Sequence, residues 1–236
     1  MIEAYVTNLG KYTEGTLIGE YLKLPATKED VQALLTRIGI DGVLYEEVFI
    51  TDYETEVSGL RALLGEYESI DELNYLASLL SELESWELAK FEAVLEVGEY
   101  TGSVKDLINL VQNLDCYEFL EHVVNEEDLG RYYVDEAGIC DIPDNVKPYF
   151  DYEAYGRDIA LERGGVFTKR GYIENNGDRF VEHYSGRDDI TDEYRIFYYP
   201  EQSEKTSLKE KLEIYGVIAA SQPTREKTNR TCEERV

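Results

Sequence analysis

Carboxylates are the residues of this chain with the greatest capacity for chemistry. The 236 residues include 50 Asp and Glu against 23 Lys and Arg. A pair of carboxylates can serve as general acid and base, but only where two environments separate their pKa values, which a sequence does not reveal. A glycosidase or a metal enzyme is therefore one alternative. Ten acids accompany a single base, Lys90, between residues 62 and 104: Glu66, Glu68, Asp71, Glu72, Glu82, Glu84, Glu87, Glu92, Glu96 and Glu99.

Patterns typical of other catalytic classes are absent from the sequence. His122 and His183 are the two histidines, and neither has the spacing of a paired metal ligand. The chain contains no G-x-S-x-G, Walker or G-x-G-x-x-G pattern. The acids of 125–130 and 188–193 do not follow the EF-hand arrangement. We therefore predict a protein that is not an enzyme, with no catalytic residue, no metal site and no cofactor.

The formal charge of -27 is concentrated in one part of the chain. Residues 1–162 carry a net charge of -26, whereas residues 163–236 carry -1. Nucleic acids and anionic membranes attract Lys and Arg, so neither is expected as a direct partner. Adaptation to high salt is another source of acidic composition, but it would make the whole surface acidic. The C-terminal third is neutral, so we do not favour this explanation.

Like charges recur at helical spacing without intervening bases. Glu96 lies four residues after Glu92 and three before Glu99. Each such pair costs an isolated helix about 0.2–0.5 kcal/mol. Asp115, Glu118 and Glu121 also repeat at steps of three, if that stretch is helical. A solvated face that maintains solubility is the simpler interpretation of any single pair, but the extent of the acidic stretch indicates a basic partner.

A groove built for DNA is one such partner, together with a basic tail or a basic enzyme surface. Carboxylates at i and i+4 lie about 6 Å apart along a helix axis, whereas one DNA strand has a phosphate about every 3.4 Å. A surrogate for DNA therefore needs two or more rows of acids, and residues 62–136 contain enough of them.

Cysteine usage and hydropathy indicate the compartment. Three widely spaced cysteines, Cys116, Cys140 and Cys232, suit a reducing environment better than a disulfide framework. No stretch approaches the roughly 18 apolar residues that span a bilayer. We expect a cytoplasmic protein.

Residues 1–61 read as a small α+β domain. Strand-like runs cover 2–7, 16–24 and 44–51. A helix is expected after the capping residues of 27–30, with a stop at Gly39. A domain of this size has a core that is only marginally stabilising, so we expect it to pack against a neighbouring domain.

Residues 62–113 read as an acidic helical domain. Apolar residues recur with a period near 3.6 in three helices, which begin near Ser69, Ser85 and Ser103. Residues 114–200 read as a second α+β domain, with helices at 125–138 and 152–161. A hairpin of 165–173 and 179–184 around Asn176-Gly177 and a strand at 194–199 follow. Residues 201–236 are expected to form a helix over 208–220 and a disordered tail.

Several segments resemble the ArdA antirestriction proteins in order and spacing. They are Asn8 to Tyr12 with Gly15, Leu17, Gly19-Glu20 and Leu24-Pro25, then Tyr45 to Glu47, Asp52 to Glu54 and Ile70 to Asn74. The stretch Arg131-Tyr132-Tyr133-Val134-x-Glu136-x-Gly138 is similar to the family's antirestriction motif, and Tyr149 to Asp158 follows. The likeness covers about 1–175. Tyr21 stands where the family often has Trp, 57–65 looks like an insertion, and 176–236 extend beyond the compact members.

The resemblance implies a DNA mimic that is encoded on conjugative plasmids and transposons. Such a protein occupies the DNA-binding groove of type I restriction-modification enzymes. It implies an elongated protomer of three domains, α+β, helical and α+β, that pairs into a homodimer. Such a dimer would carry an acidic excess equal to the charge of roughly 26 base pairs. Another acidic adaptor, for a different basic DNA-associated protein, is the alternative. The predicted surrogate phosphates are Glu82, Glu87, Glu92, Glu96, Glu99, Asp115, Glu118, Glu121, Glu126, Glu127 and Asp128. The predicted motif and possible dimer region is Leu129, Arg131, Tyr132, Tyr133, Val134, Glu136 and Gly138.

Overall fold

The structure is a computed structural model that describes residues 2–140 and 142–200. The helix expected over 208–220, the tail and Cys232 lie outside these residues. The described strands are β1 (Ile2–Asn8), β2 (Gly19–Leu24), β3 (Val48–Thr55), β4 (Tyr117–Glu121), β5 (Val166–Phe167) and β6 (Gly171–Asn175). The α-helices are α1 (Leu9–Thr13), α2 (Lys28–Arg37), α3 (Ile70–Glu82), α4 (Ser85–Val97), α5 (Val104–Val111), α6 (Glu126–Arg131) and α7 (Tyr152–Arg163). Short 3-10 turns occupy Leu60–Leu63, Leu114–Cys116, Lys147–Tyr149 and Arg187–Asp189, and a π-helical turn occupies Tyr132–Glu136.

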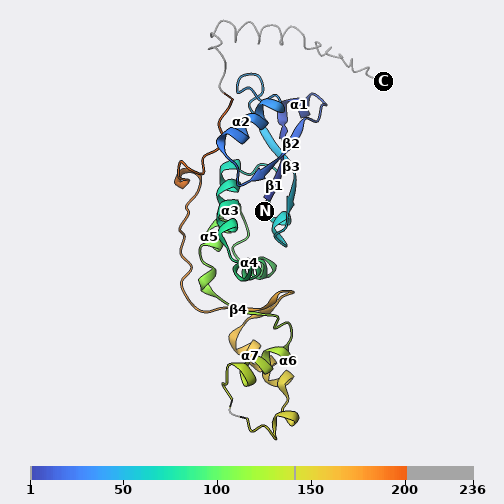
Figure 1. Ribbon diagram of the computed structural model, residues 1–236, viewed down its shortest axis with the longest axis vertical. Coiled ribbons are helices and arrows are strands. Elements are labelled where there is room, and N and C mark those ends of the chain that lie inside the picture. The colour runs from blue at the N-terminus through green and yellow to red at the C-terminus, as the bar shows by residue number, and fades with distance from the viewer. Residues whose placement is uncertain (1, 141, 201–236) are drawn as a thin grey trace, which may run out of the picture. The chain divides into compact units, whose positions relative to one another are not determined.

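The first sheet is antiparallel, with the strand order β2-β1-β3 (Figure 1). The second half of β1, from Val6 to Asn8, is buried, and β3 begins later than the apolar run at 44–51 had predicted. A capping box starts α2, because the Thr27 side chain accepts from the Asp30 N–H and the Asp30 side chain accepts from Thr27. Gly39 has a positive φ of 77° and follows the helix, as predicted.

One apolar core joins this sheet to the helical segment. Ile2 and Leu24 from the sheet belong to the same buried cluster as Leu73, Phe91 and Leu107 from the three helices. The expected packing of the small N-terminal core against a neighbour is therefore confirmed. A core shared in this way removes more apolar surface from water than either part could alone.

The three predicted helices of the acidic segment are confirmed. Ser69 and Ser103 accept hydrogen bonds from backbone N–H groups of the first turns of α3 and α5. Gly98 ends α4 in the left-handed conformation, with a φ of 86°. Of the described helices, none is long and apolar enough to cross a membrane.

The second sheet has the order β4-β6-β5, so the hairpin predicted around Asn176-Gly177 is wrong. The hairpin instead joins β5 to β6 across Thr168, whose hydroxyl donates to the carbonyl of Gly171 (2.7 Å). β6 pairs along its whole length with β4, from Tyr117 opposite Asn175 to Glu121 opposite Gly171. Residues 179–184 are excluded from the sheet because β4 and β5 already occupy the two edges of β6.

The chain between 178 and 200 forms no strand, which also corrects the strand predicted at 194–199. Asn109 of α5, Asn113 just beyond it and Asp71 of α3 bind the backbone of this segment, a role that a neighbouring strand has in a sheet. The fold is thus α+β, as predicted, with two small antiparallel sheets and mixed helices. The division into three domains stays a prediction.

Candidate acidic interaction surface

Eight of the eleven predicted surrogate phosphates form no ion pair with a basic side chain in the described part of the chain. We call them the unpaired acids. Most are exposed, and Glu87, Glu126 and Asp128 are partly buried. Burial and pairing therefore leave a set of carboxylates whose charge is not neutralised locally. The unpaired acids are Glu82, Glu87, Glu96, Glu99, Asp115, Glu118, Glu126 and Asp128.

Glu92 differs from them, because its side chain is buried and bound on two sides. The residue is 5% exposed, its Oε1 accepts from the backbone N–H of Ser58 (2.8 Å), and its Oε2 pairs with Arg170. A buried and paired carboxylate cannot present its charge to a partner. This position therefore has a structural role, linking α4 to the β5–β6 turn.

Glu96 and Glu99, which follow Glu92 at helical spacing, also contact the region of the second sheet. Glu96 Oε2 accepts from the backbone N–H of Lys169 (3.3 Å), and Glu99 accepts from the Tyr117 hydroxyl (2.9 Å). Burial of the phenol and its bond to Glu99 raise the pKa of Tyr117. Both carboxylates are nevertheless exposed. Glu96 on α4 and Glu99, two residues beyond its end, therefore bind the β5–β6 turn and β4 and still leave negative charge accessible.

Asp115, Glu118 and Glu121 do not form a helical row. Tyr117–Glu121 is β4, and residues three apart on a strand point to opposite faces. Glu118 lies directly opposite Glu174 of β6, and the side chain of Glu174 is buried and paired with Arg163 (2.6 Å). The three acids therefore do not form one helical row. Asp115 and Glu118 are two separate exposed residues, and Glu121 is the last residue of β4.

The first turn of α6 carries three predicted acids, two of which, Glu127 and Asp128, have local partners. Asn125 caps the helix by accepting from the N–H of Asp128 (2.9 Å), while Asp128 accepts from the amide of Asn125 (2.8 Å). Glu127 pairs with Arg131 (2.7 Å). Carboxylates near a helix N-terminus also stabilise the helix dipole. Local stability accounts for part of this acidity.

Lys90 is the one base between 62 and 104, and it is 8% exposed. Burial lowers its pKa, against the opposing attraction of Glu118 and Asp115. Lys90 therefore forms no ion pair with the unpaired acids in the described part of the chain, although it attracts Glu118 and Asp115.

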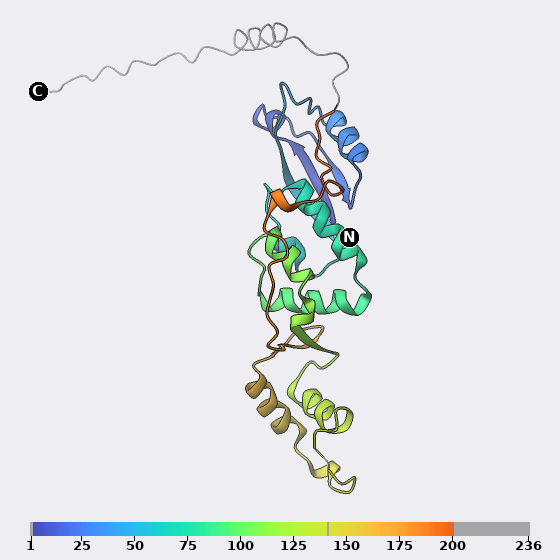
Figure 2. The same ribbon diagram turned by 90° about the vertical axis from the view of Figure 1, so that its left-hand side faces the viewer.

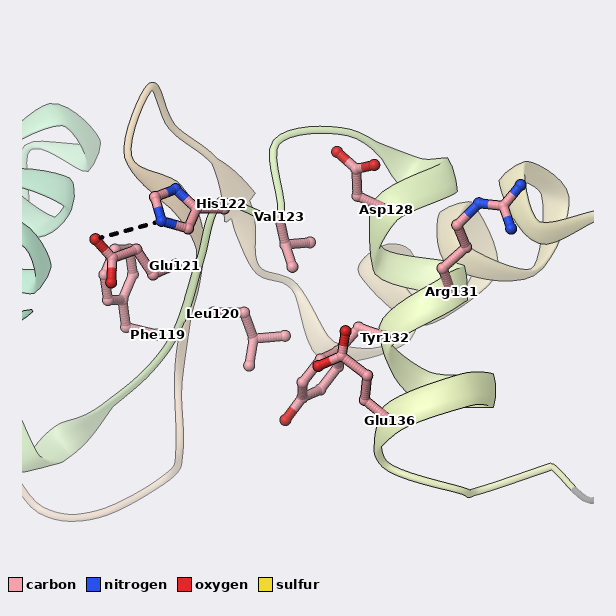
Figure 3. A pocket seen from close by; sticks show the side chains of 9 residues that line it. All are labelled: Phe119, Leu120, Glu121, His122, Val123, Asp128, Arg131, Tyr132 and Glu136. Carbon is pink, nitrogen blue, oxygen red and sulfur yellow. Dashed lines mark ion pairs between the residues drawn. The ribbon is translucent and has the colours of Figure 1, made fainter.

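A cleft of about 470 Å³ lies beside the predicted motif. It is lined by the end of β4 and by the helical turns that follow, and Tyr132 and Glu136 project toward Leu120 (Figure 3). Glu121 and His122 lie 3.9 Å apart at its edge. The cleft presents Glu121, Asp128 and Glu136 together with Arg131, so it has mixed charge. Within residues 2–140 and 142–200, no three His, Cys, Asp or Glu side chains are placed to hold a metal ion.

The predicted motif residues have several different environments. Leu129 and Tyr133 belong to the small core beside the second sheet, and Val134 is also buried. The guanidinium of Arg131 lies 4.5 Å from the ring centre of Tyr152. Gly138 has a positive φ of 64°. Much of the motif therefore serves packing, and Arg131, Tyr132 and Glu136 are its members at the cleft.

Comparison with known proteins identifies the family. Residues 4–174 match the model of the antirestriction protein (ArdA) family. The chain belongs to the ArdA antirestriction family. A search of curated proteins finds no match. The ArdA match includes the unpaired acids, the cleft and the motif, and it ends before the segment 178–200.

Two glycines within the ArdA region were missed by sequence reasoning. Gly130 and Gly156 lie inside α6 and α7, which pack closely along each other (Figure 2). A Cβ on Gly156 would overlap with the carbonyl oxygen of Glu126, and one on Gly130 with the carbonyl oxygen of Tyr152. A glycine within a helical pattern is the signal that could have predicted this contact, because it permits close backbone approach.

Proposed function

We propose that this ArdA protein is a DNA mimic that occupies the DNA-binding groove of type I restriction-modification enzymes and protects incoming mobile DNA. Exposed carboxylates that form no ion pair within the described residues, such as Glu82 and Asp115, are the observation that carries the proposal. Lys and Arg side chains that normally bind phosphates would bind these carboxylates. No covalent bond is made or broken, so the protein acts as an inhibitor and not as an enzyme.

The proposal includes a cytoplasmic homodimer. Each elongated protomer would consist of an α+β domain at 1–61, a helical domain at 62–113 and a second α+β domain at 114–200. Two protomers together would carry an acidic excess of about 52 charges, twice the net charge of residues 1–162. At one charge per ~1.7 Å of duplex, this excess equals the charge of roughly 26 base pairs.

Competition with DNA tests the proposal. Binding of a DNA duplex to a purified type I enzyme is measured with increasing inhibitor at several salt concentrations. A mimic should displace the duplex, and its own affinity should fall steeply with salt, as expected when many ion pairs form with the same groove. Inhibition without displacement, or binding only to a different basic DNA-associated protein, would favour an acidic adaptor.

Two matched variants locate the surface. The first converts six unpaired acids to amides, which retain an oxygen acceptor. The second converts six acids that already pair with Lys or Arg, so both lose the same formal charge. We expect a large loss of inhibition only in the first, and equal losses or unchanged inhibition would contradict the proposed surface. The first set is Glu82, Glu87, Glu96, Glu99, Asp115 and Glu118; the second is Glu14, Glu20, Asp52, Glu127, Asp135 and Glu182.

A further inference from the structure

The segment 178–200 lies beyond the ArdA match and contacts several distant parts of the protein. It leaves the end of β6, follows α5 and α3, and reaches α2 (Figures 1 and 2). It has almost no regular secondary structure of its own. Its placement therefore depends on how the rest of the protein binds it.

Asn109 of α5 and Asn113, two residues beyond its end, bind the backbone of the segment as a neighbouring strand would. Asn113 accepts from the N–H of Val181 and donates to the carbonyl of Val181, both at 2.8 Å. Asn109 accepts from the N–H groups of His183 and Tyr184 and donates to the carbonyl of Tyr184 (2.8–2.9 Å). Both asparagines are at most 3% exposed. Without the segment, the side-chain oxygens of both asparagines would lose the N–H donors that they bind here.

On α3, two adjacent carboxylates bind the segment further along. Asp71 accepts from the N–H groups of Ile196 and Phe197, both at 2.8 Å. Glu72 accepts from the Tyr184 hydroxyl (2.9 Å) and pairs with Arg187 (2.9 Å). The side chain of Glu72 is 9% exposed, so these partners neutralise a charge that burial would otherwise destabilise.

The end of the segment binds the N-terminal sheet region. The Tyr199 hydroxyl donates to the carbonyl of Glu46 (3.0 Å), and the amide of Gln32 donates to the carbonyl of Tyr199 (3.2 Å). Gly42 leaves room for the Tyr199 ring, since a Cβ there would lie 2.8 Å from it. Lys28 lies 4.0 Å from the centre of the Tyr198 ring. One short piece of chain thus contacts α5, α3 and α2 in succession.

We propose that residues 178–200 are an intramolecular strap that holds the N-terminal sheet region and the helical segment in one fixed arrangement. Asn109, Asn113 and Asp71 are its positioning residues. A rigid groove binds a rigid ligand with less loss of conformational entropy. The strap therefore maintains the spacing of the acids presented to the partner, and this second part of the inference rests on the proposed function.

The test cuts the strap from the rest of the full chain. A recognition site for a specific protease is inserted between Gly177 and Asp178, and the cut protein is passed over a sizing column at micromolar concentration. The fragment that begins at Asp178 should remain bound to the remainder. Separation of the fragment from the otherwise unchanged protein would overturn the strap.

Matched substitutions identify the contacts that matter. The double variant Asn109→Ala with Asn113→Ala should release the cut fragment at least about tenfold faster, because two buried amides no longer bind its backbone. Glu182→Gln is the control, since Glu182 lies on the strap but pairs with Lys105 at the exposed surface. Equal release rates for the two variants would contradict the assignment of Asn109 and Asn113.

Hydrogen exchange on the uncut protein gives a reading that does not depend on the cut. The amides of Val181, Tyr184 and Ile196 should be protected in the unchanged chain and should lose protection in the double variant. Exchange at unprotected rates in the unchanged chain would overturn the strap. Neither measurement involves a restriction enzyme, so failure of the proposed function leaves both results interpretable.

Inhibition of a type I enzyme then tests the second part. Stopping the chain after Asn176 should weaken inhibition at least about tenfold, although every unpaired acid is retained. Undiminished inhibition would show that the strap does not maintain the inhibitory surface. Absence of inhibition by the unchanged chain would instead contradict the proposed function alone.

Discussion

The backbones of Gly130 in α6 and Gly156 in α7 lie in direct contact. A Cβ on Gly156 would come within 2.7 Å of the backbone nitrogen of Gly130. This contact lets the two helices pack so closely that neither tolerates a side chain at the crossing. It also explains why a helix that begins with three acids and leads into the predicted motif contains a glycine.

Replacement of Gly156 by alanine should therefore destabilise the protein. Helix propensity alone favours alanine by about 1 kcal/mol, but overpacking at the crossing should cost about 1–3 kcal/mol or more. Urea unfolding measures the difference. Gly102→Ala is the control, because the nearest atom to its added Cβ is the carboxylate oxygen of Asp106 at 3.2 Å. A more stable Gly156→Ala protein would contradict the close packing.

Glu92 and Glu82 should respond differently to the same substitution. Glu92→Ala leaves the Ser58 N–H and Arg170 without their partner, and we expect a loss of about 1–3 kcal/mol in the free energy of unfolding. Glu82 is exposed, so Glu82→Ala should change it by less than about 0.5 kcal/mol. Denaturant unfolding of the two variants compares them directly. Equal stability would show that Glu92 behaves as an ordinary surface acid.

Loss of the Asn125 cap should loosen α6. Asn125→Ala removes the acceptor for the Asp128 N–H, and such changes typically cost about 1 kcal/mol. Asn125→Asp provides the control, since it retains the acceptor at the helix N-terminus. Faster amide exchange in α6 of the alanine variant checks the prediction. Unchanged exchange would mean that the tertiary contact with α7 alone holds the helix.

Tyr21 should ionise at unusually high pH. Its hydroxyl donates to Asp52 (3.0 Å), and this bond to a carboxylate raises the pKa of Tyr21 to about 12. Because the folded-state pKa exceeds the ordinary value of 10.0, the bond's contribution to stability is present below pH 10 and is lost as the pH rises through about 12. A tyrosine ring resonance in the NMR spectrum that titrates near pH 12 and disappears in Tyr21→Phe would confirm the raised pKa. Titration of that resonance near pH 10 would contradict it.

Local signals in the sequence were enough to predict most of the helices, although α1 was not predicted. The apolar period of α3 and the capping residues Ser69, Thr27 and Ser103 act over three or four positions, so their effect does not depend on distant chain. The same is true of the stop at Gly98. The resemblance to the ArdA proteins also rests on local segments, and the family match confirms it.

The candidate surface was only partly predictable. A count of acids cannot distinguish Glu92, bound by Arg170, from Glu82, because the two look alike in sequence. The spacing of Asp115, Glu118 and Glu121 did not establish whether the stretch is helical. The pairing of β4 with β6 shows that it is not. Residues that pair across a sheet do so through partners far along the chain, which the spacing of the acids does not encode.

The sequence by itself determined the amount of negative charge, its concentration in residues 1–162, the helices that carry much of it and the family. Only the tertiary structure decided which carboxylates remain without a basic partner and where residues 178–200 lie. Asp71 binds the backbone of Ile196 across 125 residues. The physical reason is that burial and ion pairing are properties of the folded neighbourhood, whereas charge and helical period are properties of the chain.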